Sequence, residues 1–179
     1  MTEKQIMEAA IQAGFHDAAI IDTSEIVFDP SFRPLCEENL CGKYGVNYSC
    51  PPDCGSPAEM KRRVLAHKKA VVLQSMWEIY DFQDEAAVKN AKQCHNACAL
   101  QLAEELRKEN LNGFLIGASG CQLCKVCAIV DGQPCRFPDQ KYSCMSAYCI
   151  YVKKLADCCN MAYAYEDGLL PFFGMYVFD

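Results

Sequence analysis

The sequence lacks the signatures of the common cofactor-dependent and hydrolytic enzymes. It contains no G-x-x-x-x-G-K-S/T phosphate loop, no G-x-G-x-x-G dinucleotide fingerprint and no G-x-S-x-G nucleophile elbow. The C-x3-C-x2-C spacing of a radical enzyme is missing too, because Pro57 stands where Cys50 and Cys54 would need a third thiol. No side-chain catalytic site is visible, and whether the protein is an enzyme stays open.

Long apolar segments and an excess of positive charge are also missing. No apolar run approaches the roughly 20 residues that cross a bilayer, and residues 1–10 are charged and amphipathic, unlike a signal peptide. The 17 basic residues are outnumbered by 23 acidic ones, for a formal charge of -6, which argues against a phosphate-binding surface. We expect a cytoplasmic protein that binds neither nucleic acid nor membranes.

Cysteine, by contrast, is abundant, with 14 among 179 residues. In a reducing compartment thiols are expected to stay free, so metal ligation is a better use for them than a disulfide framework. The chain is long enough for one well-cored domain, and no linker divides it. Residues 1–179 are predicted to form a single metal-binding domain.

The most informative segment carries Cys121, Cys124, Cys127 and Cys135 in a C-x2-C-x2-C-x7-C run. A tetrahedral zinc site usually takes its ligands from two separate pairs. A [4Fe-4S] cluster presents four iron corners, so three closely spaced thiolates can each take a corner while a fourth closes the site. The spacing favours an iron-sulfur cluster, with zinc as the alternative.

A second group of four cysteines precedes this run and consists of Cys36, Cys41, Cys50 and Cys54, spaced C-x4-C-x8-C-x3-C. Residues 28–57 contain five prolines and three glycines without periodicity, which predicts an irregular loop. Such a loop suits a second cluster, and incidental thiols in a tight loop are the alternative. Whether Cys54 is the fourth ligand is open; without it, one iron would be free to bind a substrate.

Together the two motifs resemble a known family. Cys-Gly-Lys-Tyr-Gly-Val-Asn-Tyr-Ser-Cys-Pro-Pro, followed by Cys-x2-Cys-x2-Cys and Gly-Gln-Pro-Cys-Arg-Phe-Pro, is similar to predicted metal-binding proteins defined only as a domain of unknown function. The resemblance covers most of the chain and implies cysteine-bound metal, with iron-sulfur as the expected form and no settled reaction. That family tends to continue Pro-Ser-Met-Glu-Ala-x-Gly, from which Cys144 and Cys149 depart. We interpret these two as local additions rather than ligands.

The remaining cysteines have simpler explanations. Cys94 and Cys98 lie on the apolar stripe of a predicted helix, which indicates core packing. His95 lies about 100° around that helix from Cys94 and is expected on the solvated surface. Cys158 and Cys159 are adjacent, so we expect one to face the core and the other to face solvent.

Helical and extended patterns alternate along the chain. Helices are predicted at residues 3–14, 57–67, 84–109 and 143–160, and strands at residues 18–21, 70–79, 113–117 and 172–178. Both cysteine loops fall between a strand and the next helix. The predicted fold class is α/β or α+β, with a sheet of about four strands flanked by helices and an open strand order.

These observations favour an iron-sulfur protein with one or two [4Fe-4S] clusters, which exchanges single electrons with a redox partner protein of unknown identity. Lys43, Lys125 and Arg136 are the expected groups that tune the cluster potential. The alternatives are a zinc-stabilised interaction module and an enzyme whose cluster keeps one open iron. The sequence does not indicate an oligomeric state.

Overall fold

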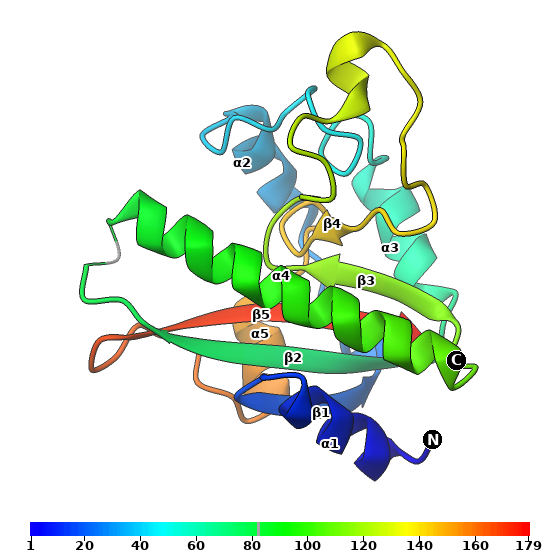
Figure 1. Ribbon diagram of the computed structural model, residues 1–179, viewed down its shortest axis with the longest axis vertical. Coiled ribbons are helices and arrows are strands. Elements are labelled where there is room, and N and C mark those ends of the chain that lie inside the picture. Colours follow the sequence, from blue (N-terminus) through cyan, green and yellow to red (C-terminus); the bar gives the residue numbers. More distant parts are fainter. Residues whose placement is uncertain (82) are drawn as a thin grey trace.

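Alternating side chains on the central strands face two hydrophobic cores, one on each side of a five-stranded sheet (Figure 1). The computed structural model describes residues 1–81 and 83–179. The strands are β1 (Asp17–Asp22), β2 (Lys69–Glu78), β3 (Gly113–Gly117), β4 (Ser143–Cys144) and β5 (Leu169–Phe178). Their order is β1-β2-β5-β3-β4; β3 and β4 pair in parallel, and the other neighbours are antiparallel.

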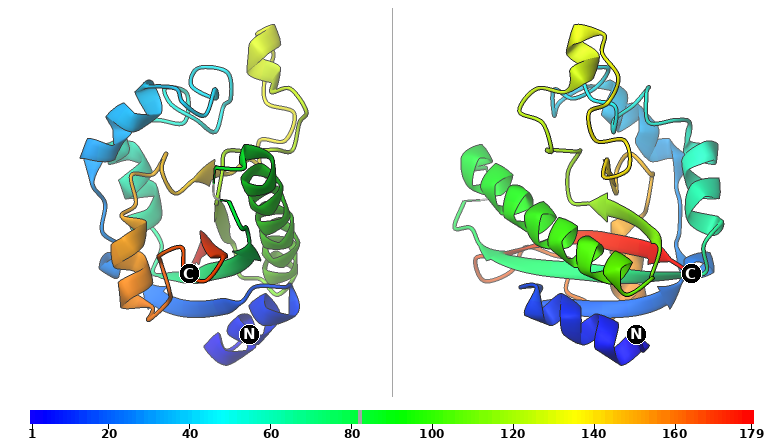
Figure 2. Two further views of the ribbon diagram at one scale, coloured as in Figure 1. Left: turned by 90° about the vertical axis from the view of Figure 1, so that its left-hand side faces the viewer. Right: turned by 45° about the vertical axis from the view of Figure 1, so that its right-hand side comes forward.

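Helices cover both faces of the sheet. They are α1 (Glu3–Gln12), α2 (Arg33–Glu37), α3 (Pro57–Leu65), α4 (Glu85–Lys108) and α5 (Val152–Cys158). Val71 and Leu73 of β2 share a core with α1 and α4, whereas Ala70 and Val72 share the other core with α3 and α5 (Figure 2). Because successive side chains of a strand point to opposite faces, the buried run of β2 fixes a three-layer arrangement.

This arrangement confirms the predicted α+β domain, with one correction in the sheet. Residues 143–160 were predicted to be helical, but they begin with β4, and α5 starts only at Val152. The sheet therefore has five strands instead of about four. A strand of two residues is too short to show the alternation by which strands are recognised in a sequence.

Polar caps fix the starts of α3, which follows the first cysteine loop, and of α4. At α3, the Glu59 N–H donates to Ser56 Oγ (3.3 Å) and the Ser56 N–H donates to the Glu59 carboxylate (2.8 Å), which is the predicted capping box. At α4, the carboxylate of Asp84 accepts hydrogen bonds from the N–H groups of Ala86 and Ala87. The cap at Ser56 also fixes the end of the first cysteine loop.

His95 is buried in the core, so its predicted place on the solvated surface was wrong. The residue is only 1% exposed, and its Nδ1 atom lies 2.7 Å from Ser75 Oγ. Gly174 makes room for the ring, because a Cβ at that position would lie 2.7 Å from His95 Nε2. The buried face of α4 contains Ala91, His95 and Ala99. It is therefore not centred on Cys94 and Cys98, as the sequence pattern had predicted.

Cys98 and the adjacent pair Cys158 and Cys159 take the expected places, whereas core packing of Cys94 stays a prediction. Cys98 packs against the core that α1 and α4 share, and Cys94 is partly buried. Cys158 is exposed, whereas Cys159 packs against the opposite core. These four thiols have structural surroundings that need no ligand role.

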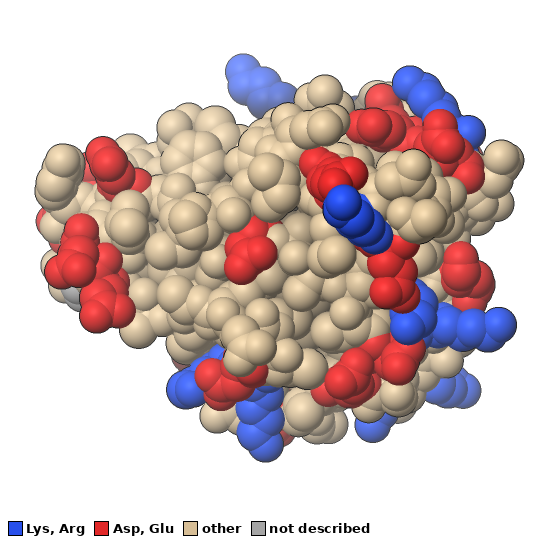
Figure 3. Space-filling view, turned by 90° about the horizontal axis from the view of Figure 1, so that it is seen from below, with Lys and Arg blue, Asp and Glu red and all other residues tan. Residues whose placement is uncertain are grey.

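Charged side chains of both signs share the surface. On the face seen from below, acidic and basic side chains lie next to one another toward one end (Figure 3). Across residues 1–81 and 83–179, no helix is both long enough and apolar enough to span a membrane. The predicted absence of nucleic-acid binding stays a prediction.

Burial lowers the pKa of His95 from 6.5 to about 4. Between these values the unfolded chain binds a proton that the folded chain does not, so stability falls as the pH drops through this window and is unaffected above it. We expect His95 to account for a loss of up to about 3 kcal/mol of unfolding free energy in the metal-free protein. Urea unfolding at pH 6.5 and at pH 4 should show a smaller loss of unfolding free energy for His95→Gln than for the wild-type protein. Equal losses in both proteins would contradict this assignment.

Candidate metal centre

Two long loops lie beyond the same end of β3 and β4, at the top of Figure 1. The first connects α2 to α3, and the second connects β3 to β4. The two loops, together with Cys36 in α2, carry the two sets of predicted ligands. They are named here the Cys50 group (Cys36, Cys41, Cys50 and Cys54) and the Cys121 group (Cys121, Cys124, Cys127 and Cys135). All 14 cysteines of the chain are free thiols.

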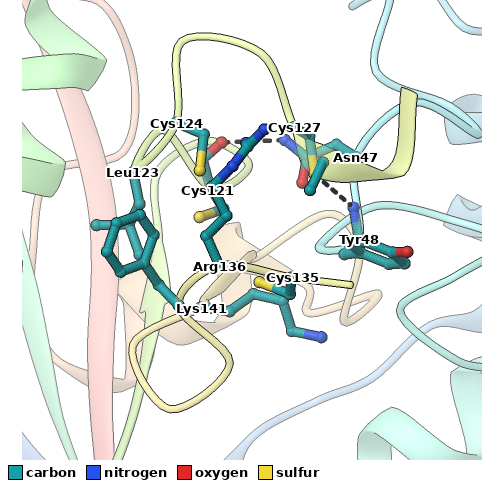
Figure 4. A pocket seen from close by; sticks show the side chains of 11 residues that line it. Asn47, Tyr48, Cys121, Leu123, Cys124, Cys127, Cys135, Arg136 and Lys141 are labelled. Atoms are coloured by element: carbon teal, nitrogen blue, oxygen red, sulfur yellow. Dashed lines mark hydrogen bonds between the residues drawn. The ribbon is translucent and has the colours of Figure 1, made fainter. Parts of the chain in front are cut away.

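The four thiols of the Cys121 group line one pocket (Figure 4). Their sulfur atoms lie around a common space, and the unfilled volume is about 330 Å³, part of it open to solvent. Asn47 and Tyr48 of the first loop form part of the wall, and Arg136 and Lys141 lie beside it. The structure thus brings together all four cysteines of the C-x2-C-x2-C-x7-C run.

Backbone N–H groups are directed at sulfur atoms of the Cys121 group. The Tyr48 N–H lies 3.5 Å from Cys127 Sγ, and the N–H groups of Leu123 and Tyr142 donate to the Cys121 sulfur. Burial raises the pKa of Cys121, and these donors oppose that rise because they favour the thiolate. A bound cation would supply the remaining stabilisation of the ionised form.

Cross-loop hydrogen bonds brace the pocket. The guanidinium of Arg136 donates to the Val126 carbonyl oxygen (3.1 Å), which connects two points within the second loop. The Tyr48 hydroxyl donates to the Gln133 carbonyl oxygen (2.9 Å), which ties this loop to the first. The thiols of the Cys121 group are therefore held by contacts from both loops.

Ser49 connects the two thiol groups. Its hydroxyl oxygen accepts the Cys121 N–H (2.9 Å) and lies 3.8 Å from Cys50 Sγ, while the Asn47 side chain donates to the Cys121 carbonyl oxygen (3.0 Å). Gly120 permits this close approach, because a Cβ there would lie 2.9 Å from Cys50 Sγ. One hydroxyl thus touches a sulfur of one group and the backbone of the other.

Cys144 of β4 lies near the Cys50 group, where it packs against the same core cluster that contains the buried Cys54. The charge on Cys144 acts on Cys36, Cys50 and Cys54, and the charge on Cys41 acts on Cys144. Cys50 and Cys54 are buried, Cys36 and Cys144 are partly buried, and Cys41 is exposed. The interpretation of Cys144 as a local addition rather than a ligand stays a prediction.

Cys144 reaches the Cys50 group through tertiary structure. It belongs to β4, whose pairing with β3 returns the chain to the loop end of the sheet. Cys149, the other departure from the family pattern, is buried and has φ = 55°, in the left-handed region. Glycine adopts that conformation without strain, which fits the glycine that ends the family pattern. No spacing rule would have joined Cys144 to thiols so far away in the sequence.

Burial makes the metal-free thiols of the Cys50 group reluctant to ionise. Burial, together with a smaller contribution from the neighbouring Cys144, raises the pKa of Cys36 to about 11 and that of Cys50 to about 12. These side chains are therefore protonated at neutral pH without a cation. Metal binding has to release their protons, so the affinity should fall as the pH is lowered.

Arg33 is a buried cation beside the Cys50 group. It is 9% exposed, donates to the carbonyl oxygens of Gly55 and Ala147 (2.8 Å each), and keeps Nε without a hydrogen-bond partner among the described residues. No carboxylate in the described part of the chain forms an ion pair with it. Its charge opposes the burial that raises the pKa of Cys36 and Cys54. Since buried charges are normally paired, thiolates are its natural counter-ions.

Comparison with known proteins identifies a family. A family model described as "Predicted metal-binding protein (DUF2284)" matches residues 19–178. No curated protein and no solved structure matches the chain. The match confirms the family resemblance, includes both thiol groups and supports metal binding without specifying the metal.

Within residues 1–81 and 83–179, no three Cys, His, Asp or Glu side chains are close enough to hold one metal ion.

Replacing Arg33 by methionine should destabilise the metal-free protein. Methionine has a similar length, but it leaves the carbonyl oxygens of Gly55 and Ala147 without their donor, which we expect to cost about 2–4 kcal/mol of unfolding free energy. Arg62→Met, at an exposed position of α3, is the matched control and should change stability by less than about 0.5 kcal/mol. Urea unfolding measures both, and equal stabilities would show that Arg33 does not hold the loop.

Proposed function

Because the chain belongs to the DUF2284 family of predicted metal-binding proteins, we propose that it is an iron-sulfur protein that exchanges single electrons with a partner protein. In this proposal, [4Fe-4S] clusters bind at the Cys121 group and at the Cys50 group. The observation that carries the proposal is the pocket lined by all four thiols of the Cys121 group. Four thiolates are the ligand set of such a cluster.

The surroundings of the Cys121 group fit this cofactor. A bound cluster supplies one-electron redox chemistry, and its potential is set by hydrogen bonds to sulfur, nearby charge and solvent exposure. The chain provides each of these: N–H donors at Cys121 and Cys127, the cations Arg136 and Lys141, and an opening to solvent. The cations offset the negative charge that four thiolates bring.

Contact between the two groups supports electron exchange between them. Ser49 touches Cys50 Sγ and the Cys121 backbone, so a continuous path of bonded and hydrogen-bonded atoms joins the two sites. Such a path could carry electrons between two clusters, a use that a protein whose metals serve only to fold its loops does not have. It therefore favours electron transfer over a zinc-stabilised interaction module.

Exposed apolar side chains suggest where the partner docks. Large ones on α2 and the two loops are Leu35, Leu40, Val46, Val126, Val130 and Phe137. Leu40 is 88% exposed and lies next to Cys41, itself an exposed thiol. Exposed apolar residues gathered near a site are typical of protein–protein contact, so we infer that the partner meets the protein at the loop end.

An enzyme with an open iron is the second candidate function, and one cavity favours it. Cys54 lines this cavity together with Arg63, Lys141 and Tyr148. Two cations and a phenol could bind an anionic substrate beside the Cys50 group. This alternative requires that one iron of that cluster lacks a thiolate.

Purification without oxygen tests the proposed cofactor. We expect a brown protein with about eight iron and eight sulfide ions per chain when both clusters are present. Cys124→Ser should remove about half of each, because it breaks the Cys121 group only. Cys158→Ser, which changes an exposed thiol outside both groups, is the control and should retain the full content. A colourless protein containing only zinc would overturn the proposal.

The charge on Lys141 should affect the potential of the cluster at the Cys121 group. Reduction adds one negative charge to the cluster, and a nearby cation stabilises the reduced state. Lys141→Gln should therefore shift the reduction potential to a more negative value in a redox titration. Lys108→Gln, at the C-terminal end of α4, is the control. Identical potentials in all three proteins would show that Lys141 has no influence.

A further inference from the structure

The cavity beside the Cys50 group is lined by side chains that can bind a ligand without an open iron. It lies between α3, the β3–β4 edge of the sheet and parts of both loops, and its unfilled volume is about 650 Å³, part of it open to solvent. Pockets of this size hold small organic molecules. We propose that it binds an aromatic carboxylate. The donors for the carboxylate belong to Arg63, Lys141, Ser143 and Tyr148.

Two cations in the cavity have no carboxylate partner. Arg63 belongs to α3 and Lys141 to the second loop, so the two charges reach the cavity from different elements. Neither forms an ion pair within residues 1–81 and 83–179. Asp53 is the single carboxylate among the lining residues, which leaves one positive charge in excess. The cavity therefore attracts an anionic ligand.

The guanidinium of Arg63 keeps most of its capacity to donate hydrogen bonds. Its two bonds, to the Tyr148 hydroxyl and to the Cys54 carbonyl oxygen, are both 3.4 Å long, beyond the usual range of about 2.7–3.2 Å. The N–H groups of a guanidinium form a planar fork that matches the two oxygens of a carboxylate. A carboxylate in the cavity would thus accept strong, charge-assisted bonds where the protein makes only weak ones.

Two buried hydroxyl groups line the same cavity with unused donors. Tyr148 is 2% exposed, and its hydroxyl accepts an Arg63 N–H but donates to no acceptor among the described residues. Ser143 is 6% exposed, and its hydroxyl forms no hydrogen bond within the described part of the chain. Buried polar groups normally have a partner. Because carboxylate oxygens only accept hydrogen bonds, a bound carboxylate would supply the missing acceptors.

Aromatic side chains favour a planar ring in the ligand. Phe114 and Tyr148 are stacked, with ring centroids 6.1 Å apart and an angle of 19° between the rings. Leu115 and Pro138 add apolar surface to the lining. Since aromatic rings attract one another beyond the effect of burial alone, a ring on the ligand gains contacts that a bare phosphate or acetate ion does not make.

Calorimetric titration with sodium benzoate, on protein purified without oxygen, tests the site. We expect saturable binding of benzoate. Benzamide, which has the ring without the charge, and acetate, which has the charge without the ring, should both bind much more weakly. Absence of saturable benzoate binding would overturn the proposal, and so would equal binding of benzamide or acetate. Tighter binding of inorganic phosphate than of benzoate would overturn it in favour of a simple inorganic anion.

Two substitutions locate the binding in this cavity. Arg63→Gln should weaken benzoate binding by at least about tenfold, because it removes a charged donor. Tyr148→Phe should weaken it by about threefold, because it removes one hydroxyl and keeps the ring. Arg62→Gln changes the neighbouring exposed arginine, which does not line the cavity, and is the matched control with wild-type affinity. Wild-type affinity in Arg63→Gln or in Tyr148→Phe would overturn the assignment, provided that circular dichroism shows each variant to be folded.

The site is independent of the proposed clusters, because every donor is a side chain of the protein itself. Metal analysis of the same preparation separates the two proposals. A colourless protein that binds benzoate would overturn the clusters and support the site, whereas an iron-sulfur protein that does not bind benzoate would overturn the site alone.

Discussion

Parallel pairing of β3 with β4 is the constraint on which both thiol groups depend. The second loop leaves the sheet at Gly117 and returns through β4 beside it, so its two ends are fixed at neighbouring points of one edge. This closure places the Cys121 group over the loop end of the sheet and brings Cys144 to the Cys50 group. Two residues of strand thereby connect thiols that the sequence separates by long segments. Without this pairing the second loop would lose the anchor that sets it against the first loop.

Electrostatics then makes the loops depend on metal. Burial disfavours ionised thiols in the Cys50 group, while Arg33 is buried beside them without a carboxylate partner in the described residues. In the metal-free protein the guanidinium therefore has polar carbonyl partners but no full counter-charge. Thiolates bound to a metal ion would give Arg33 a counter-charge, and the metal ion would offset the cost of ionising buried thiols. We therefore expect folding of the first loop to be coupled to metal binding, with Arg33 as the residue that couples them.

Sequence patterns predicted what depends on local periodicity and left out what depends on tertiary contact. The apolar run of β2 and the capping box at Ser56 were both identified, because each is encoded within a few neighbouring residues. β4 was missed, since two residues carry no period, and His95 was placed outside, since Gly174 makes its space from another strand. For the site, the Cys121 group followed from its spacing. Cys144 did not, because only strand pairing brings it near.

The two groups provide unequal environments for the same cofactor. The Cys121 group lies in a pocket open to solvent, with Arg136 and Lys141 at its side, whereas Cys50 and Cys54 are buried and Arg33 is the nearby cation. Exposure, hydrogen bonds to sulfur and nearby charge set the potential of a cluster, so two identical clusters would differ in potential here. Ser49 joins the sites directly. In the proposed electron carrier, an electron that enters at one cluster would therefore have both a path and an energetic reason to move to the other.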